Sequence, residues 1–133
     1  MSTCEEQLKE NCEWIAEKLE GLADGKLYDQ EAGELVDRES IEDENNCYDE
    51  SRYQDLWAYL SDDNYGIKIT TDLDGSSLYG ADICVAFGGP NIYIETRDSC
   101  VRGYWGSDRV EVPLSYSACD AINDIIDEWR SCY

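Results

Sequence analysis

The chain has 133 residues, of which 31 are acidic and 10 are basic, so its formal net charge at neutral pH is −21. This length predicts one domain, spanning residues 1–133, with enough apolar residues for a modest core. The charge argues against direct nucleic-acid binding. It serves either solubility or a basic partner, in particular a protein that itself binds nucleic acid. The acidity is uneven, because residues 1–64 contain 20 acidic and 5 basic side chains whereas residues 65–133 contain 11 and 5.

The first long element predicted is a helix from the capping signature Ser2-Thr3 with Glu5-Glu6 to about Leu22, ending near Gly25. Apolar residues spaced by four and three positions form a stripe along it: Leu8, Cys12, Ile15, Leu19 and Leu22. A parallel row of carboxylates has the same spacing: Glu6, Glu10, Glu13, Glu17 and Glu20. The two rows are offset by about 200°, which predicts that the glutamates line the face away from the core. A plain solvated face is the alternative, although such a face usually mixes lysine with glutamate.

Residues 26–64 are predicted to be less regular. A short helix is expected over 29–36, with Leu35 and Val36 pointing inward. Residues 37–50 have few apolar side chains and are predicted to form a mobile or irregular acidic loop. A second helix is predicted over 51–60, with four residues at helical spacing towards the core: Tyr53, Leu56, Trp57 and Leu60. An acidic turn follows, containing Asp62 and Asp63.

The stretch from Ile67 to Val112 alternates apolar and polar residues, which predicts an antiparallel β-meander. The expected strands are 67–71, 83–87, 91–95, 101–105 and 109–112, with glycine-, asparagine-, aspartate- or serine-rich turns between them. The continuous apolar run 83–87 is typical of a central strand covered on both faces. Period two places the following residues on one apolar face: Ile67, Ile69, Ile92, Ile94, Val101, Trp105, Val110 and Val112. The opposite face carries Lys68, Tyr93, Glu95, Arg102, Tyr104, Arg109 and Glu111.

A C-terminal helix is predicted after Pro113, with Ser117 and Asp120 as its capping signature. Its apolar face is expected to contain Ala118, Ile122, Ile125, Ile126 and Trp129, and its outer face Asp120, Asp124, Asp127 and Glu128. Together these elements predict an α+β fold. In it, a four- to five-stranded antiparallel meander carries the N- and C-terminal helices on one face.

The seven cysteines are scattered without a Cys-x-x-Cys pair, and the sequence contains no histidine. Their odd number and spacing argue against a zinc site and a disulfide framework, so we predict reduced cysteines, several of them in the core. The sequence shows neither a signal peptide nor an apolar run near the ~20 residues that cross a bilayer. We therefore expect a cytoplasmic protein without membrane contact or cofactor, as a monomer or a homodimer.

Three short patterns suggest chemistry, and each has a simpler interpretation. Asp82 with Glu95-Thr96-Arg97 resembles the carboxylates of metal-dependent nucleases, but such sites require a lysine at the third place and a basic surface for the substrate. The segment 72–76 resembles the start of a calcium loop, but the closing glutamate is absent and a β-turn explains it better. Gly88-Gly89-Pro90 lacks the Lys-Ser/Thr and helix of a phosphate loop. The sequence therefore predicts no enzymatic activity.

The acidic half is instead predicted to contact a basic partner. The candidate contact residues there are the helix row Glu6, Glu10, Glu13, Glu17 and Glu20, with Asp37, Glu39, Glu42, Asp43, Glu44, Asp62 and Asp63. A second, weaker contact surface is predicted on the polar sheet face at Tyr93, Arg102, Tyr104 and Arg109, because tyrosine and arginine are enriched at interface hot spots. The alternative is cross-strand pairing of Arg102 and Arg109 with Glu95 and Glu111.

Three segments of the C-terminal half carry a resemblance to known proteins: Phe87-Gly88-Gly89-Pro90-Asn91-Ile92-Tyr93-Ile94-Glu95-Thr96, then Gly103-Tyr104-Trp105-Gly106, then Arg109-Val110-Glu111-Val112-Pro113-Leu114. They resemble small acidic proteins of phages and conjugative elements of gut Firmicutes. In size and charge the whole chain is similar to anti-CRISPR and antirestriction inhibitors. The resemblance implies a DNA mimic that blocks a Cas effector or other defence nuclease in a bacterial host cell. An immunity protein or antitoxin against a basic nuclease toxin, and a non-inhibitory acidic adaptor, remain alternatives.

Overall fold

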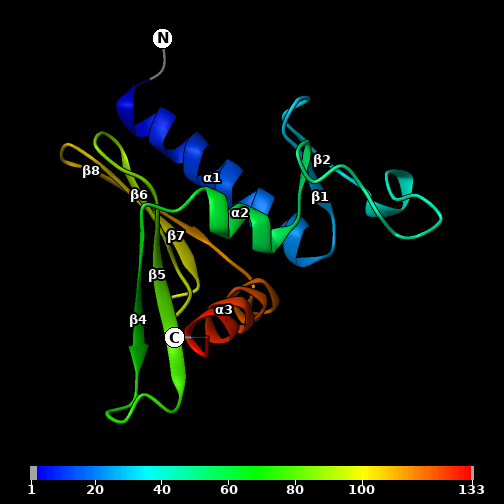
Figure 1. Cartoon of the computed structure of the whole chain (residues 1–133). Helices are drawn as coiled ribbons and strands as arrows, with labels where there is room; N and C mark the ends of the chain where they lie inside the picture. Colours follow the sequence, from blue (N-terminus) through cyan, green and yellow to red (C-terminus); the bar gives the residue numbers. More distant parts are fainter. Residues whose placement is uncertain (1–2, 133) are drawn as a thin grey trace.

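The computed structural model describes residues 3–132, and the predicted α+β fold is confirmed. Within these residues there are two antiparallel sheets, with strand orders β2-β1-β3 and β4-β5-β6-β7-β8 (Figure 1). The elements in chain order are α1 (Cys4–Ala23), β1 (Leu27–Asp29), β2 (Glu34–Val36), the 3-10 helix η1 (Arg38–Ser40), β3 (Tyr53–Gln54), α2 (Leu56–Asp62), β4 (Gly66–Thr71), β5 (Leu78–Ala86), β6 (Asn91–Glu95), β7 (Cys100–Trp105), β8 (Asp108–Pro113) and α3 (Tyr116–Arg130).

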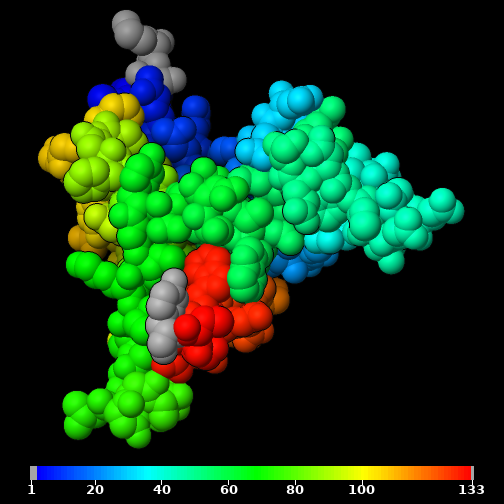
Figure 2. Space-filling model, viewed as in Figure 1, coloured from blue at the N-terminus to red at the C-terminus, as the bar shows by residue number. Residues whose placement is uncertain are grey.

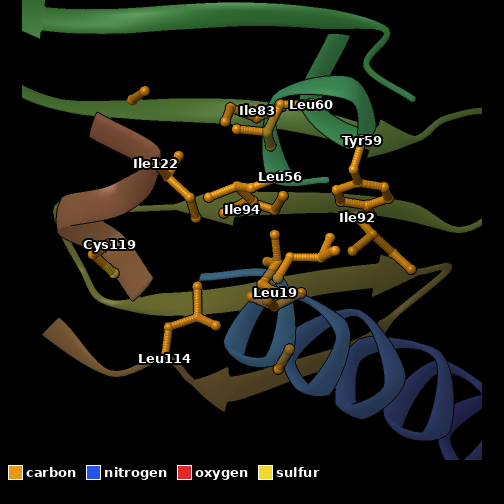
Figure 3. Close-up of a cluster of buried hydrophobic side chains, with 14 of the residues drawn as sticks. Leu19, Leu56, Tyr59, Leu60, Ile83, Ile92, Ile94, Leu114, Cys119 and Ile122 are labelled. Carbon is orange, nitrogen blue, oxygen red and sulfur yellow. The ribbon is translucent and has the colours of Figure 1, made fainter. Parts of the chain in front are cut away.

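The helices lie on one face of the five-stranded sheet, as the apolar alternation predicted. α1 packs on β7 and β8, and α3 packs on β5 and contacts α1. Figure 3 shows the side chains between these layers, where Leu19 of α1, Ile94 of β6 and Ile122 of α3 are all fully buried. The burial of apolar surface between the helices and the sheet is the main force that holds the two layers together.

α1 begins with the predicted capping box, although Ser2 lies outside the described residues. The hydroxyl of Thr3 accepts a hydrogen bond from the backbone N–H of Glu6, and the Glu6 carboxylate accepts one from the backbone N–H of Thr3. The helix lies close to β7 because Gly103 has no side chain. A Cβ at Gly103 would come within 2.6 Å of the Cys12 sulfur and 2.7 Å of the nearest atom of Leu8.

The predicted helix over 29–36 is wrong, because this segment forms the hairpin β1–β2. Leu27 pairs with Val36 and Asp29 pairs with Glu34. The chain reverses between them, where the Asp29 carboxylate accepts hydrogen bonds from the backbone N–H groups of Glu31 and Ala32, and Gly33 adopts a positive φ of 70°. An aspartate that bonds its own turn competes with helix formation, and glycine adopts this φ without strain.

The predicted helix over 51–60 is also partly wrong, since α2 begins only at Leu56. Tyr53 and Gln54 instead form β3, which pairs with β1. Asp55 is the N-cap, and its carboxylate accepts a hydrogen bond from the backbone N–H of Ala58 at 2.9 Å. Leu56 and Leu60 are buried as expected, whereas Tyr53 is half-buried and Trp57 is exposed.

The five predicted strands are all present, but the length of one strand, its position in the sheet and the burial of Ile69 differ from the prediction. β5 is longer than the predicted 83–87 and ends before Phe87, which is exposed. It is second from the edge rather than central, and within residues 3–132 both long helices lie on one of its faces only. Ile69 is on the apolar face, opposite Ala81, but it is exposed because the helices do not extend over β4.

The start of α3 differs from the predicted capping signature by two residues. Ser115, rather than Ser117, is the N-cap, and its hydroxyl accepts a hydrogen bond from the backbone N–H of Ala118. The predicted apolar face is confirmed, with Ala118, Ile122 and Ile126 buried. None of the helices in the described part of the chain combines the length and apolar character needed to cross a bilayer.

The seven cysteines are divided between core and surface. The buried ones are Cys12, Cys84, Cys100 and Cys119, and the exposed ones are Cys4, Cys47 and Cys132. Burial raises the pKa of the Cys12 thiol to about 11 and also raises the pKa of Cys100 and Cys119. The prediction that several cysteines are core residues is therefore confirmed.

Candidate functional site

The outer face of α1 carries the predicted row of glutamates, and four of its five side chains face solvent. Glu6, Glu10, Glu13 and Glu17 are exposed on the side of the helix opposite the buried stripe. Glu6 takes part in the capping box, and Glu13 lies 3.8 Å from the exposed ammonium of Lys9. Within residues 3–132, Glu10 and Glu17 have no hydrogen-bonding or ion-pair partner, so their charges are available to a binding protein.

Glu20, the fifth member of the row, points to α3 instead of solvent. Its carboxylate accepts hydrogen bonds from the backbone N–H of Ser115, at 3.1 Å, and from the Ser115 hydroxyl. A carboxylate is favourable at this position because the N-terminus of a helix carries a partial positive charge. The prediction that Glu20 belongs to an outward-facing row is therefore wrong, and the free row ends at Glu17.

A second acidic surface is formed by residues 24–54, which we call the arm. The arm contains the three-stranded sheet and projects from the C-terminal end of α1, away from the larger sheet (Figures 1 and 2). It carries eleven acidic and three basic side chains. Exposed acidic side chains of the arm that have no hydrogen-bonding or ion-pair partner within residues 3–132 are Asp24, Glu34, Glu39, Glu44 and Glu50.

Several predicted contact residues of the arm have intramolecular partners. Asp37 lies 3.9 Å from the ammonium of Lys26. Glu42, with a side chain only 14% exposed, forms an ion pair with Arg38 at 3.3 Å. The Asp43 carboxylate accepts hydrogen bonds from two backbone N–H groups of its own turn. Apart from η1, segment 37–50 is irregular, as predicted. Several of its acidic side chains form bonds within the arm and stabilise its conformation.

The arm is held together by an ion pair between the buried Asp29 and the half-buried Arg52. Asp29, which is buried, accepts two hydrogen bonds from the Arg52 guanidinium, at 3.0 and 2.9 Å, and Arg52 also bonds to Glu31. The guanidinium and the two backbone N–H donors lower the pKa of the Asp29 carboxyl to about 2. Asp29 therefore remains charged at neutral pH and fixes β1 against β3.

The arm meets the body of the protein at Lys18 of α1. This side chain is 7% exposed, and its ammonium lies 3.5 Å from the ring centroid of Tyr28 and 4.2 Å from that of Tyr59. Tyr28 belongs to β1 and Tyr59 to α2, so a single cation contacts both the arm and the following helix. Burial lowers the pKa of Lys18 to about 8, and the charge of Asp63 opposes this shift.

The last two predicted acidic contacts lie at the end of α2. Asp62 and Asp63 are both exposed, and the Asp62 carboxylate accepts a hydrogen bond from the Gln54 amide at 3.2 Å. They follow the arm in sequence and precede β4. They therefore extend the acidic surface from the arm towards the sheet edge.

On the polar sheet face, Arg102 was predicted to contact a partner protein, but its guanidinium is bound by acidic side chains of the chain itself. Its guanidinium bonds to Glu95 at 2.6 Å, to Glu111 at 2.7 Å and to Asp98 at 3.4 Å. The alternative interpretation, cross-strand pairing, is thus confirmed for Arg102. Arg109 instead lies over the Tyr104 ring at 5.6 Å from its centroid.

Aromatic residues on this face line an open cleft. Two of them, Tyr93 and Tyr104, were predicted from the sequence as contact residues. Tyr93 and Tyr104 meet edge to face, with ring centroids 6.3 Å apart. The cleft has a volume of about 550 Å³ and also involves Tyr65 and Phe87, both exposed at its rim. Tyr65 carries no strand signal because it lies just before β4, and Phe87, although part of the predicted strand 83–87, lies just after β5.

The Asp82 and Glu95 carboxylates, which resemble part of a nuclease site in the sequence, lie on neighbouring strands, and Glu95 is engaged by an arginine. Asp82 is opposite Glu95 in the register of β5 and β6, and Glu95 bonds to Arg102. Within residues 3–132, no group of three or more histidine, cysteine or acidic side chains is arranged to hold a metal ion. The segment 72–76 forms a turn in which the Asp72 carboxylate accepts hydrogen bonds from Ser76 and Ser77.

Comparisons of this chain with protein-family models, with curated proteins and with solved structures found no match.

Proposed function

We propose that the chain is an acidic inhibitor protein that occupies the basic nucleic-acid groove of a host-defence nuclease, such as a Cas effector, by imitating DNA. The observation that carries the proposal is the exposed acidic surface of α1 and the arm. Glu10 and Glu17 on α1, and Glu39 and Glu44 on the arm, face solvent without an intramolecular partner within residues 3–132. The proposal assigns no catalysis to the protein and places it in the cytoplasm of a bacterial host.

The spacing of the α1 charges supports this proposal. Glu6 to Glu17 span about 16 Å at 1.5 Å per residue, which gives one carboxylate per ~5 Å. Each strand of B-DNA carries one phosphate per ~3.4 Å, so a helix row together with a neighbouring acidic arm approaches the charge density of a duplex. A basic groove that binds such a surface releases the same counterions that DNA would release.

The rigidity of the surface also supports the proposal. The carboxylates of α1 stand on a helix packed against the sheet, and the arm is fixed by the Asp29–Arg52 ion pair and by Lys18. Charges that are already positioned lose little conformational freedom on binding. A flexible acidic tail would pay more entropy for the same contacts, which is why a folded acidic surface suits an inhibitor.

Competition with DNA tests the proposal. A panel of purified Cas effectors, restriction enzymes and basic nuclease toxins is incubated with labelled DNA, and the protein is added in increasing amounts. We expect at least one effector or restriction enzyme to release its DNA in proportion to the protein bound. Binding to a toxin alone would support the immunity-protein alternative. Binding that leaves the DNA in place would contradict mimicry.

A further inference from the structure

The edge strand β4 has an unpaired main-chain edge and an uncovered apolar side. Within the described residues it pairs only with β5, and α1 and α3 pack chiefly on other strands. Ile69, on the side of the sheet that faces the helices, is 43% exposed. Figure 1 shows β4 at the outer border of the sheet. A free strand edge presents a row of N–H and C=O groups that can pair with another extended segment.

An apolar groove lies directly beside this edge. It has a volume of about 610 Å³, is bordered by α2, α3 and β4, and contains Trp57, Ile67, Ile126 and Trp129 among its lining residues. The two tryptophan rings meet edge to face, with centroids 5.3 Å apart, and Trp57 is 41% exposed. A strand added to β4 would direct alternate side chains to this side, where the groove could receive them.

The edge is held in place before anything binds. The guanidinium of Arg130, at the end of α3, donates hydrogen bonds to the backbone carbonyls of Gly75 and Ser76 in the β4–β5 turn. Arg130 also bonds to Asp127 of its own helix. Because these bonds fix the turn to α3, the edge needs little reorganisation to accept a further strand.

The charges around β4 indicate what kind of segment fits. The strand itself contains no acidic residue, but Asp62 and Asp63 precede it and Asp72 and Asp74 follow it. Its six residues span about 20 Å, so the two acidic pairs bracket a strand that carries Ile67 and Ile69 on the groove side and the exposed Lys68 on the opposite side. A second copy of this chain would bring aspartates against aspartates in either strand orientation. A segment with basic ends is favoured by both pairs.

We propose that the β4 edge and the Trp57–Trp129 groove form a docking site for an extended segment of a partner protein. This segment has alternating apolar residues at its centre and lysine or arginine at both ends. The inference does not rest on the proposed function, because it involves neither the α1 row nor the exposed carboxylates of the arm.

A peptide probe tests the docking site. The probe has five alternating valines and threonines between two pairs of lysines, and the control peptide carries glutamates in place of the lysines. Each is titrated into isotope-labelled protein, and amide and indole resonances are followed by NMR. We expect the lysine peptide to shift the resonances of residues 66–71 and the indole N–H of Trp57 and Trp129. The glutamate peptide should bind at least tenfold more weakly.

Two variants with the same charge change separate docking from simple attraction. Ile69→Lys places a cation on the groove side of β4, whereas Thr70→Lys places it on the other side of the same strand. Ile69→Lys should weaken binding of the lysine peptide at least tenfold, and Thr70→Lys should weaken it much less. The proposal is overturned if the peptide shifts only resonances of α1 and the arm, if it shifts none, or if 66–71 shift with protein concentration alone.

Discussion

Lys18 is the residue at which the arm is joined to α1 and α2. Its ammonium lies between the Tyr28 and Tyr59 rings, where cation–π attraction partly replaces lost hydration. Burial nevertheless lowers its pKa from 10.5 to about 8, so the folded protein binds this proton less tightly than the unfolded chain does. Stability therefore rises with pH wherever the unfolded chain still holds the proton and the folded protein does not.

This linkage predicts a pH-dependent difference between the wild type and Lys18→Met. Between about pH 7.5 and 9.5, the free energy of unfolding of the wild type should rise by about 1–2 kcal/mol relative to the variant. Urea unfolding at several pH values measures it. Comparing the two proteins cancels the opposite trend from Tyr59 and Cys12, whose pKa values burial raises.

Lys9→Met is the matched control, because Lys9 is exposed on the same helix. The difference in free energy of unfolding between Lys9→Met and the wild type should stay constant over this pH range. If the Lys18→Met and wild-type curves also run parallel, Lys18 is not desolvated in the folded protein and does not connect the arm to the body in the way described.

Among the elements, α1 and α3 are linked by Glu20. Its carboxylate bonds to the backbone N–H and hydroxyl of Ser115, at the start of α3. Glu20→Ala should therefore lower the free energy of unfolding by about 1 kcal/mol, as the loss of a capping interaction usually does. Urea unfolding checks this value. Glu17→Ala, one turn away and solvent-exposed, should leave stability unchanged or slightly higher.

Equal effects of the two substitutions would show that the bonds from Ser115, the N-cap of α3, to Glu20 do not contribute to stability. The same pair has a second use in binding experiments. Glu20 should matter little for a partner that contacts the α1 row, whereas Glu17 should matter directly. We thus expect Glu20→Ala to lower stability without weakening binding, and Glu17→Ala to weaken binding without lowering stability.

Some elements of the fold can be predicted from the sequence alone, and others cannot. The meander was predictable because each strand carries its own alternation and each turn its own glycine, asparagine or aspartate. The hairpin β1–β2 was not, because its strands have three residues each and depend on Arg52, which reaches Asp29 from a distant position in the sequence. A short segment with mixed local signals takes its structure from such tertiary contacts.

In the candidate site, too, features that depend on local geometry could be predicted, and long-range contacts could not. Helical periodicity correctly placed Glu10, Glu13 and Glu17 outward, since that depends only on local geometry. It could not show that Glu20 is used by Ser115, which is 95 positions away. Alternation likewise assigned Ile69 to the apolar face but could not reveal that the helices stop short of β4.

At the scale of the whole molecule, the charge is segregated. The acidic α1 face and the arm lie in the N-terminal half, while on the sheet Arg102 pairs with Glu95 and Glu111. A uniform charge would serve solubility alone. A segregated one creates a directional field, which speeds association with an oppositely charged groove and makes binding sensitive to salt.

Whether the α1 carboxylates bind the nuclease groove is tested by comparing two triple variants that each remove three negative charges. One carries Glu10→Gln, Glu13→Gln and Glu17→Gln on α1, and the other carries Asp120→Asn, Asp124→Asn and Glu128→Gln on α3. The affinity of each for the nuclease identified by DNA competition is measured at low and moderate salt. We expect the α1 variant to bind at least tenfold more weakly, with a shallower salt dependence, and the α3 variant to bind nearly as the wild type does. Equal loss in both variants, or unchanged binding by the α1 variant, would contradict it.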